Sequence, residues 1–243
     1  MSNDLIKGVR FQGDRCLLID LGDRIDAAVG LRCLRLASRL RAQQLPGVLD
    51  IVPSFTAVAI FFEPHPALGN DPSQWLSEQA TLLAASLDED QPLASRRIQI
   101  PICYGGSHGP DLEDVAKRLH MSPKAVIEAH HSSITRVYML GFAPGHPYIG
   151  IHDDRFNLPR REVPRTAVPA GSLGIANRQS TIYPNVLPGG WHIIGATPLK
   201  LFDATAESPT LLMPGDEVEF TPIDETQFDR IRQEQRQPVG HAP

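Results

Sequence analysis

Between residues 141 and 203 the sequence concentrates glycine, proline, arginine, histidine and aromatic residues, a composition typical of rigid loops that meet at a pocket. The first such stretch is "GFAPGHPYIG", residues 141–150. Pro144 and Pro147 stiffen the backbone on either side of His146. An imidazole held in this way can transfer protons or bind an anion. The same residues also suit a turn with a stacked or surface histidine, so both interpretations stay open.

A cluster of arginines follows in "RFNLPRREVPR", and its members are Arg155, Arg160, Arg161 and Arg165. Each guanidinium group presents a planar fork of N–H donors that fits a carboxylate or a phosphate. The acidic residues Asp153, Asp154 and Glu162 can instead pair with these arginines as a solvated surface network. Charge alone does not decide between an anion site and such a network.

Two further stretches carry polar and aromatic groups. In "VPAGSLGIANRQSTIYP", Gln179 and Tyr183 can hydrogen-bond an amide-like ligand. The alternative there is an ordinary hairpin whose tyrosine packs against the protein. In "LPGGWHIIGATP", Trp191 follows a Pro-Gly-Gly turn and is either a core anchor or the wall of a pocket.

The predicted elements that position these groups form two units with different patterns of secondary structure. Residues 1–90 alternate strand and helix signals in the order ββαββα, which predicts a small α+β domain. Asp71 is expected to cap a helix that Pro72 opens. Residues 91–97 are read as a linker.

The second unit is predicted over residues 98–225. Asp111 and Ser122 are expected N-caps of two short helices, and from Thr135 onward short β-rich runs separated by Pro and Gly predict a barrel or sandwich. Residues 226–243 are polar and are expected to fray as a C-terminal tail.

Composition excludes several classes of function. The net charge of −5 opposes nucleic-acid binding, and no apolar run approaches the roughly 20 residues of a membrane span. Cys16, Cys33 and Cys103 are too widely spaced for a disulfide framework or a metal site, which predicts buried free thiols. The N-terminus lacks a secretory signal, so the expected location is the cytoplasm. Neither a nucleotide-binding glycine loop nor a G-x-S-x-G nucleophile elbow is present.

Four long blocks in order carry a more specific signal. They are "IPICYGGSHGPDLEDVA", "VYMLGFAPGHPYIG", "PRREVPRTAVPAGSLGIANRQSTIYPNVLPGGWHIIGATPLKLFD" and "LLMPGDEVEF". Together they resemble the family that includes the B subunit of 5-oxoprolinase, KipI and the first subunit of allophanate hydrolase, from about residue 98 to 223. The resemblance implies a cyclophilin-like β-barrel as the C-terminal domain of an α+β protein.

The resemblance also implies a function. The leading expectation is the B subunit of a cytoplasmic ATP-dependent 5-oxoprolinase, which acts with the C and A subunits to open the cyclic amide 5-oxoproline to L-glutamate. One alternative is a KipI-like inhibitor that binds a sensor histidine kinase. The other is a component of an allophanate hydrolase or of a urea carboxylase-type carboxyltransferase. No lysine lies in a biotin-carrier context, so biotin is not expected on this chain.

Site residues follow from the same blocks. Catalytic roles are expected for Arg161, Arg165, Gln179 and His146, and substrate contacts for Tyr183, Pro169, Gly171 and Trp191. Two positions depart from the family pattern. His146 stands where GFxPGFxYL has an aromatic residue, and Ala196 stands where IGRTP has an arginine, which removes an anion contact.

Overall fold

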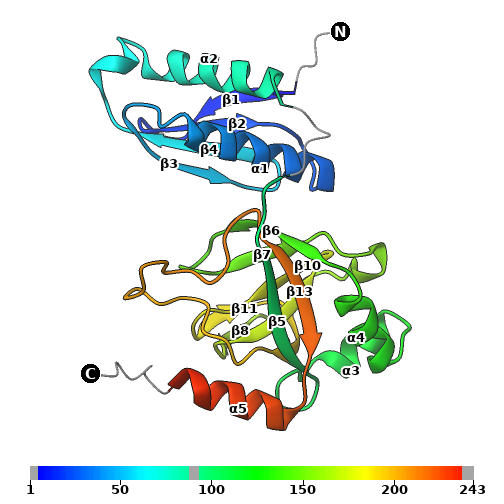
Figure 1. Ribbon diagram of the computed structural model, residues 1–243. Coiled ribbons are helices and arrows are strands. Elements are labelled where there is room, and N and C mark those ends of the chain that lie inside the picture. The colour runs from blue at the N-terminus through cyan, green and yellow to red at the C-terminus, as the bar shows by residue number, and fades with distance from the viewer. Residues whose placement is uncertain (1–4, 88–92, 237–243) are drawn as a thin grey trace, which may run out of the picture. The chain divides into compact units, whose positions relative to one another are not determined.

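Figure 1 shows the computed structural model, which describes residues 5–87 and 93–236. The chain divides into two compact units, Met1–Ala94 and Ser95–Pro243. Across the described residues, no helix combines the length and the apolar character that crossing a membrane requires. The same residues contain no group of three or more histidine, cysteine or acidic side chains arranged to hold a metal ion.

The first unit is a four-stranded antiparallel sheet with two helices, in the predicted order ββαββα. The sheet order is β1-β2-β4-β3. The elements are β1 (Gly8–Phe11), β2 (Cys16–Asp20), α1 (Ala27–Ala42), β3 (Val48–Pro53), β4 (Ala57–Phe62), the short 3-10 helix η1 (Pro66–Leu68) and α2 (Pro72–Ala85).

Capping residues and apolar periodicity explain both helices of this unit. The Asp26 carboxylate accepts hydrogen bonds from the first backbone N–H groups of α1. The Asp71 side chain accepts from Gln74 N, and Pro72 occupies the first position of α2, as predicted. Buried residues of both helices share one core with the sheet, among them Leu36 and Leu76.

The second unit is built around a closed barrel with the strand order β10-β7-β6-β13-β5-β12-β9, and the predicted barrel is therefore confirmed (Figure 1). Its strands are β5 (Arg97–Tyr104), β6 (Thr135–Leu140), β7 (Pro147–Gly150), β9 (Ser172–Ala176), β10 (Gln179–Ile182), β12 (His192–Ala196) and β13 (Glu217–Pro222). The pair β13 and β5 is parallel, whereas the other neighbours in the barrel are antiparallel. Closure leaves no unpaired sheet edge in the barrel.

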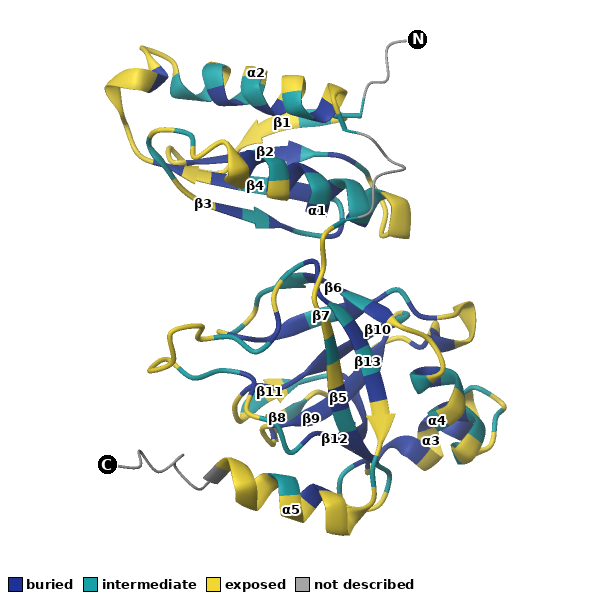
Figure 2. Ribbon diagram, in the orientation of Figure 1, coloured by how far each residue is buried: buried dark blue, intermediate teal, exposed yellow. Residues whose placement is uncertain are grey.

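Further elements surround the barrel. They are α3 (Leu112–Arg118), α4 (Pro123–His131), the 3-10 helix η2 (Asp154–Phe156), the strand pair β8 (Arg165–Val168) and β11 (Leu187–Gly189), and α5 (Glu225–Arg236). The Ser122 side chain caps α4, as predicted. Figure 2 shows every residue of β9, β10 and β12 as buried, which places these strands between the barrel core and the segments that cover it.

Two expected boundaries differ from the structure. Arg97, expected at the end of the linker, is the first residue of β5, while residues 91 and 92 lie outside the described part. Residues expected to fray after 225 instead form α5 as far as Arg236. The helix is held because Phe228 is buried in a small apolar cluster with Cys103 and Ala196. Two apolar side chains, Phe228 and Ile231, in an otherwise polar segment gave too weak a period to predict this.

A chain of polar side chains crosses the apolar barrel core. The Tyr104 hydroxyl lies 2.8 Å from His130 Nδ1, and Ser180 Oγ lies 2.8 Å from His130 Nε2 and 2.7 Å from His152 Nε2. A single serine hydroxyl donates to one imidazole and accepts from the other, so it serves two neutral rings. Burial lowers the pKa of His152 to about 4 and that of His130 well below its usual value.

These buried histidines predict that the barrel loses stability in acid. An unfolded histidine titrates near its ordinary pKa of about 6.5 and His152 only near 4. Between these values the unfolded chain binds more protons, so acidification favours unfolding, by about 3 kcal/mol for His152 at pH 4. The chain has two tryptophans, so urea unfolding can be followed by Trp191 fluorescence in a Trp75→Phe background.

The variant His152→Gln keeps a side-chain amide near Ser180 and removes the titration, so its stability is expected to fall less steeply between pH 6.5 and 4.5. The control is His131→Gln, which changes a histidine that contacts Glu128 and has no place in this chain of hydrogen bonds. An equal pH slope in wild type and His152→Gln would contradict the assignment.

Candidate functional site

A pocket of about 260 Å³ in the barrel unit is walled mainly by aromatic rings, and we call it the aromatic pocket. Its lining residues come from the turn before β7, the segment before β8, the end of β10 and the loop through β11. They are Phe142, His146, Tyr148, Arg160, Pro164, Tyr183, Pro188, Gly189, Gly190 and Trp191. Three predicted site residues, His146, Tyr183 and Trp191, therefore share one cavity.

The turn 141–146 explains why its sequence is so rich in glycine and proline. It joins the antiparallel strands β6 and β7 and is closed by hydrogen bonds from Gly141 N to His146 O and from His146 N to Ala143 O, each 3.1 Å. Gly145 has φ 72°, and a Cβ there would lie 2.8 Å from Phe202 Cβ. Only glycine combines this backbone conformation with so close an approach. The turn thereby fixes the direction of the next residue, His146.

His146 is only 1% exposed and has one defined hydrogen-bond partner. Thr181 Oγ1 lies 2.7 Å from His146 Nε2 and 2.7 Å from Pro147 O. Since a carbonyl only accepts, the Thr181 hydroxyl donates to Pro147 and must accept from His146 Nε2–H. The other ring nitrogen, Nδ1, is then an acceptor, and it is buried without a hydrogen-bond partner among the described residues.

The imidazole is kept neutral by its surroundings. Burial, followed by the charge of Arg160, lowers the pKa of His146 to about 4. Its ring packs edge-on against Tyr183 at 5.2 Å between centroids and lies 5.4 Å from the rings of Phe142 and Tyr148. The histidine thus both packs as a ring would and offers a free acceptor nitrogen beside the pocket.

Tyr183 contributes a second buried polar group to the pocket. Its hydroxyl has no partner in hydrogen-bond geometry among the described residues, although the Trp191 backbone N–H is near enough to oppose the rise that burial causes in the Tyr183 pKa. A Cβ on Gly189 would lie 2.0 Å from this hydroxyl, so glycine is required where β11 passes the ring. The phenol is therefore a neutral, buried hydroxyl in the pocket wall whose donor has no partner among the described residues.

Arg160 is the cation of the aromatic pocket. Its guanidinium carbon lies 5.1 Å from the centroid of the Trp191 ring, within cation–π range. Its positive charge adds to the effect of burial in lowering the pKa of His146, and it partly opposes the rise that burial causes in the pKa of Tyr183. Among the described residues it has no acidic partner, so its N–H groups are free to bind a carboxylate or phosphate.

The neighbouring arginines, Arg161 and Arg165, bind a buried carboxylate and do not line the aromatic pocket. Arg165 binds Asp111 through two hydrogen bonds of 2.8 Å, and Arg161 Nη1 adds a third at 3.0 Å. The Ile193 N–H also donates to the same carboxylate, at 2.7 Å. Burial raises the pKa of Asp111, but Arg165 and the Ile193 N–H outweigh it, and the net shift is downward.

This cluster was not visible in the sequence. Asp111 was expected to cap α3, yet its side chain makes no capping hydrogen bond and binds arginines 50 and 54 residues away. Of the acids nearer in sequence, Asp153 pairs with Arg155 at 2.8 Å and Asp154 with Arg178 at 2.7 Å. The expected surface network thus exists in part: the Asp153–Arg155 pair is among the expected members, whereas Asp154 pairs with Arg178, outside the four arginines.

The remaining predicted site residues lie outside the aromatic pocket. Gln179 is buried in β10, opposite Gly150 and Ala176 in the ladder. Pro169 and Gly171 line a second, larger pocket of about 500 Å³. Residues that the sequence analysis did not single out include Tyr148 and Thr181, and Tyr148 belongs to the quoted "GHPYIG" motif, which could have identified it.

Comparison with known proteins agrees with the resemblance seen in the sequence. A family model described as the carboxyltransferase domain, subdomain C and D, matches residues 8–212. A protein from Bacillus subtilis that is named as the B subunit of 5-oxoprolinase is 38% identical over 93% of this chain and 98% of that protein. A protein of the same name from Escherichia coli O157:H7 is also 38% identical, over 88% of this chain and 94% of its own length.

Solved structures share the fold. The structure of TTHA0988 has a TM-score of 0.71 and 33% identity over 87% of this chain, which spans only 40% of that protein. A conserved uncharacterized protein from Pyrococcus horikoshii is 36% identical over 90% of this chain and 99% of its own, with a TM-score of 0.54. The Kluyveromyces lactis urea amidolyase, at 22% identity and a TM-score of 0.72, shows likeness of fold alone.

The Asp111 cluster predicts a large loss of stability on removing its charge. Breaking a fully buried ion pair costs about 3–5 kcal/mol, and the partial exposure of both arginines reduces the expected loss for Asp111→Asn to about 2–3 kcal/mol. The matched control is Asp114→Asn, which removes an exposed pair with Arg118 and is expected to cost about 0.5 kcal/mol or less. Urea unfolding followed by Trp191 fluorescence measures both, and losses of equal size would contradict the structural role of Asp111.

Proposed function

Because the chain belongs to the carboxyltransferase-domain family of subdomains C and D, we propose that it is the B subunit of an ATP-dependent 5-oxoprolinase. The observation that carries this proposal is the near full-length identity of 38% to two bacterial proteins that bear this name. In the proposed complex this chain acts with the C and A subunits to hydrolyse 5-oxoproline to L-glutamate.

The aromatic pocket has the groups that such a substrate needs. 5-Oxoproline is a five-membered lactam that carries one carboxylate, so it presents an anion, an amide N–H and two apolar ring carbons. Arg160 supplies a free guanidinium group, and His146 Nδ1 supplies an unpaired acceptor for the amide N–H. The pocket volume of 260 Å³ lies below the about 300–1,000 Å³ of pockets for drug-sized ligands, which suits a small ring.

Residues of the aromatic pocket can also stabilise charge that develops in the reaction. Opening the lactam adds one water, with the hydroxyl going to the carbonyl carbon and a proton to the nitrogen that becomes the α-amino group. The amide is unreactive, and transfer of a phosphoryl group to its oxygen would make the carbon a better electrophile. In this proposal the neutral Tyr183 hydroxyl and the Arg160 cation, which both line the pocket, stabilise negative charge on that oxygen or on the carboxylate.

ATP does not fit this pocket. A nucleoside triphosphate needs more space than 260 Å³ and more than one free cation, and among the described lining residues Arg160 alone carries a permanent charge. We therefore propose that the ATP used by the complex binds outside the aromatic pocket, and that this chain contributes substrate binding. The alternatives expected from the sequence, a histidine kinase inhibitor and a carboxyltransferase component, have no observation of comparable weight behind them.

Reconstitution tests the proposed function. The chain is co-purified with the product of a neighbouring C-like gene, the A-like protein is added, and release of glutamate from 5-oxoproline is measured with and without ATP. We expect glutamate release that requires ATP and all three proteins. An intact three-protein assembly that releases no glutamate would overturn the proposal.

The role of the aromatic pocket has its own test within that assembly. Arg160→Gln removes the free guanidinium group, and we expect kcat/KM for 5-oxoproline to fall at least about tenfold because a charge-assisted hydrogen bond is lost. Arg155→Gln is the matched control, since Arg155 is exposed, pairs with Asp153 and does not line the pocket. Equal kinetics for the two variants would exclude Arg160 from substrate binding.

A further inference from the structure

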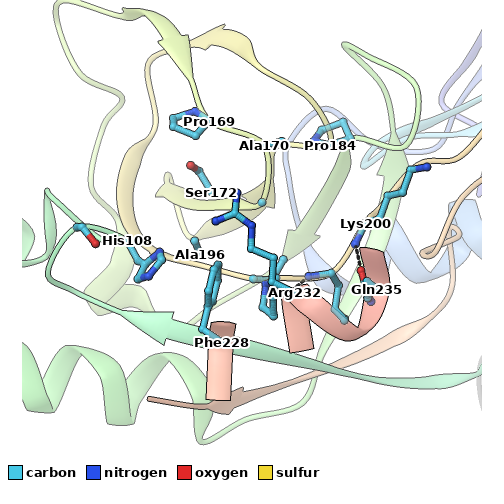
Figure 3. A pocket seen from close by; sticks show the side chains of 15 residues that line it. His108, Pro169, Ala170, Ser172, Pro184, Ala196, Lys200, Phe228, Arg232 and Gln235 are labelled. Atoms are coloured by element: carbon cyan, nitrogen blue, oxygen red, sulfur yellow. Dashed lines mark hydrogen bonds between the residues drawn. The ribbon is translucent and has the colours of Figure 1, made fainter. Parts of the chain in front are cut away.

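The second pocket of the barrel unit, of about 500 Å³, is closed on one side by helix α5 (Figure 3). Its other walls come from the loop after β5, the turn before β9 and the segment after β12. We propose that this pocket binds a small molecule carrying a carboxylate or phosphate group, and that Arg232 is the residue that anchors that group.

Helix α5 is seated so that one face is directed toward the pocket. Phe228, Arg232 and Gln235 all line the pocket, and their spacing of four and three residues places them on a single helical face. Phe228 is 5% exposed, and its ring lies 4.2 Å from that of His108. Gln235 Oε1 accepts a hydrogen bond of 3.0 Å from Lys200 N. The helix is therefore fixed to the barrel on both sides of Arg232.

Arg232 is the member of this face whose position packing does not explain. Figure 3 shows its side chain extending from α5 toward Ser172, into the pocket. Within the described part of the chain it makes no ion pair and no hydrogen bond. Arg232 is exposed to solvent, and since it lines the pocket without an acidic partner among the described residues, its N–H fork is free for an oxyanion, which it binds through paired hydrogen bonds.

The charges around the pocket favour the same kind of ligand. No aspartate or glutamate is among the described residues that line it. Two carboxylates near the pocket have a cationic or imidazole neighbour: Asp203 binds Lys200 at 2.7 Å, and Glu225 lies 4.0 Å from His108 Nε2. Lys200 is thus neutralised by a partner, and Arg232 remains as the cation that a ligand would neutralise.

This pocket is separate from the aromatic pocket, although the two meet at one point of the chain. No described lining residue is common to both. Tyr183 lines the aromatic pocket and the next residue, Pro184, lines the second pocket. Ala196, whose side chain is a single methyl group, lines the second pocket together with Arg232. The inference therefore does not depend on the proposed function.

Calorimetric titration of the full chain tests the proposal. Inorganic phosphate and L-glutamate are titrated separately, in an oxyanion-free buffer at constant ionic strength. We expect saturable binding of at least one probe and, in Arg232→Gln, binding at least about tenfold weaker because a charge-assisted contact is lost. Binding of phosphate alone identifies a phosphate ligand, and binding of glutamate alone identifies a carboxylate.

Two controls make the result specific. Arg230→Gln changes an exposed arginine that faces Glu234 on the same helix and does not line the pocket, so binding is expected to be unchanged. Arg160→Gln detects a probe that binds in the aromatic pocket instead: an affinity that falls in Arg160→Gln and not in Arg232→Gln would assign the binding to that pocket and overturn the proposal, which separates it from the 5-oxoprolinase assignment. Absence of binding by both probes to the wild-type chain, or equal binding by wild type and Arg232→Gln, would overturn the proposal.

Discussion

The buried carboxylate of Asp111 holds together the parts of the barrel unit on which the candidate site depends. It lies at the start of α3, accepts from the Ile193 N–H of β12, and binds Arg161 and Arg165 on either side of the turn into β8. Burying a carboxylate is costly unless several donors compensate, and here four hydrogen bonds do so. Arg160 immediately precedes this anchored segment. The hydrogen bonds of Arg161 and Arg165 to Asp111 thus determine the position of Arg160 over Trp191.

Hydrogen-bond compensation also distinguishes polar groups that stabilise the fold from polar groups that lack a partner beside a cavity. In the barrel core, Tyr104, His130, Ser180 and His152 satisfy most of each other's hydrogen bonds, and burial keeps both imidazoles neutral. His152 Nδ1 in this network has no partner among the described residues, and at the aromatic pocket Thr181 likewise satisfies only one nitrogen of His146; the difference is that His146 lines a cavity. Buried polar groups without partners are uncommon in folded proteins, since each costs free energy. Their presence beside a cavity is what distinguishes a binding surface from a packed interior.

Local sequence signals were sufficient for most of the fold but not for the contacts of the site. The caps at Asp71 and Ser122 act within three residues, and the first unit and the barrel follow from periodicity and turn residues. The partners of Asp111 and His146 lie 50 and 35 residues away in the chain, and only barrel closure brings them together. Helix α5 escaped prediction for the opposite reason, because its polar face is nearly continuous and a single phenylalanine anchors it. With that helix comes Arg232, in the pocket lined by Ala196, where the sequence had indicated a missing cation.

The cationic side chains that lack an acidic partner indicate what this chain contributes to an assembly. Arg161 and Arg165 are occupied by Asp111, and Lys200 by Asp203, so among the described residues the two pockets hold one unpaired guanidinium each. One guanidinium can hold one carboxylate or phosphate group, but the charge of a triphosphate spreads over several oxygens and needs more donors than either pocket offers. A chain with this arrangement is equipped to orient small anions. Under the proposed function, the groups that drive phosphoryl transfer are therefore expected from the partner subunits and not from these two pockets.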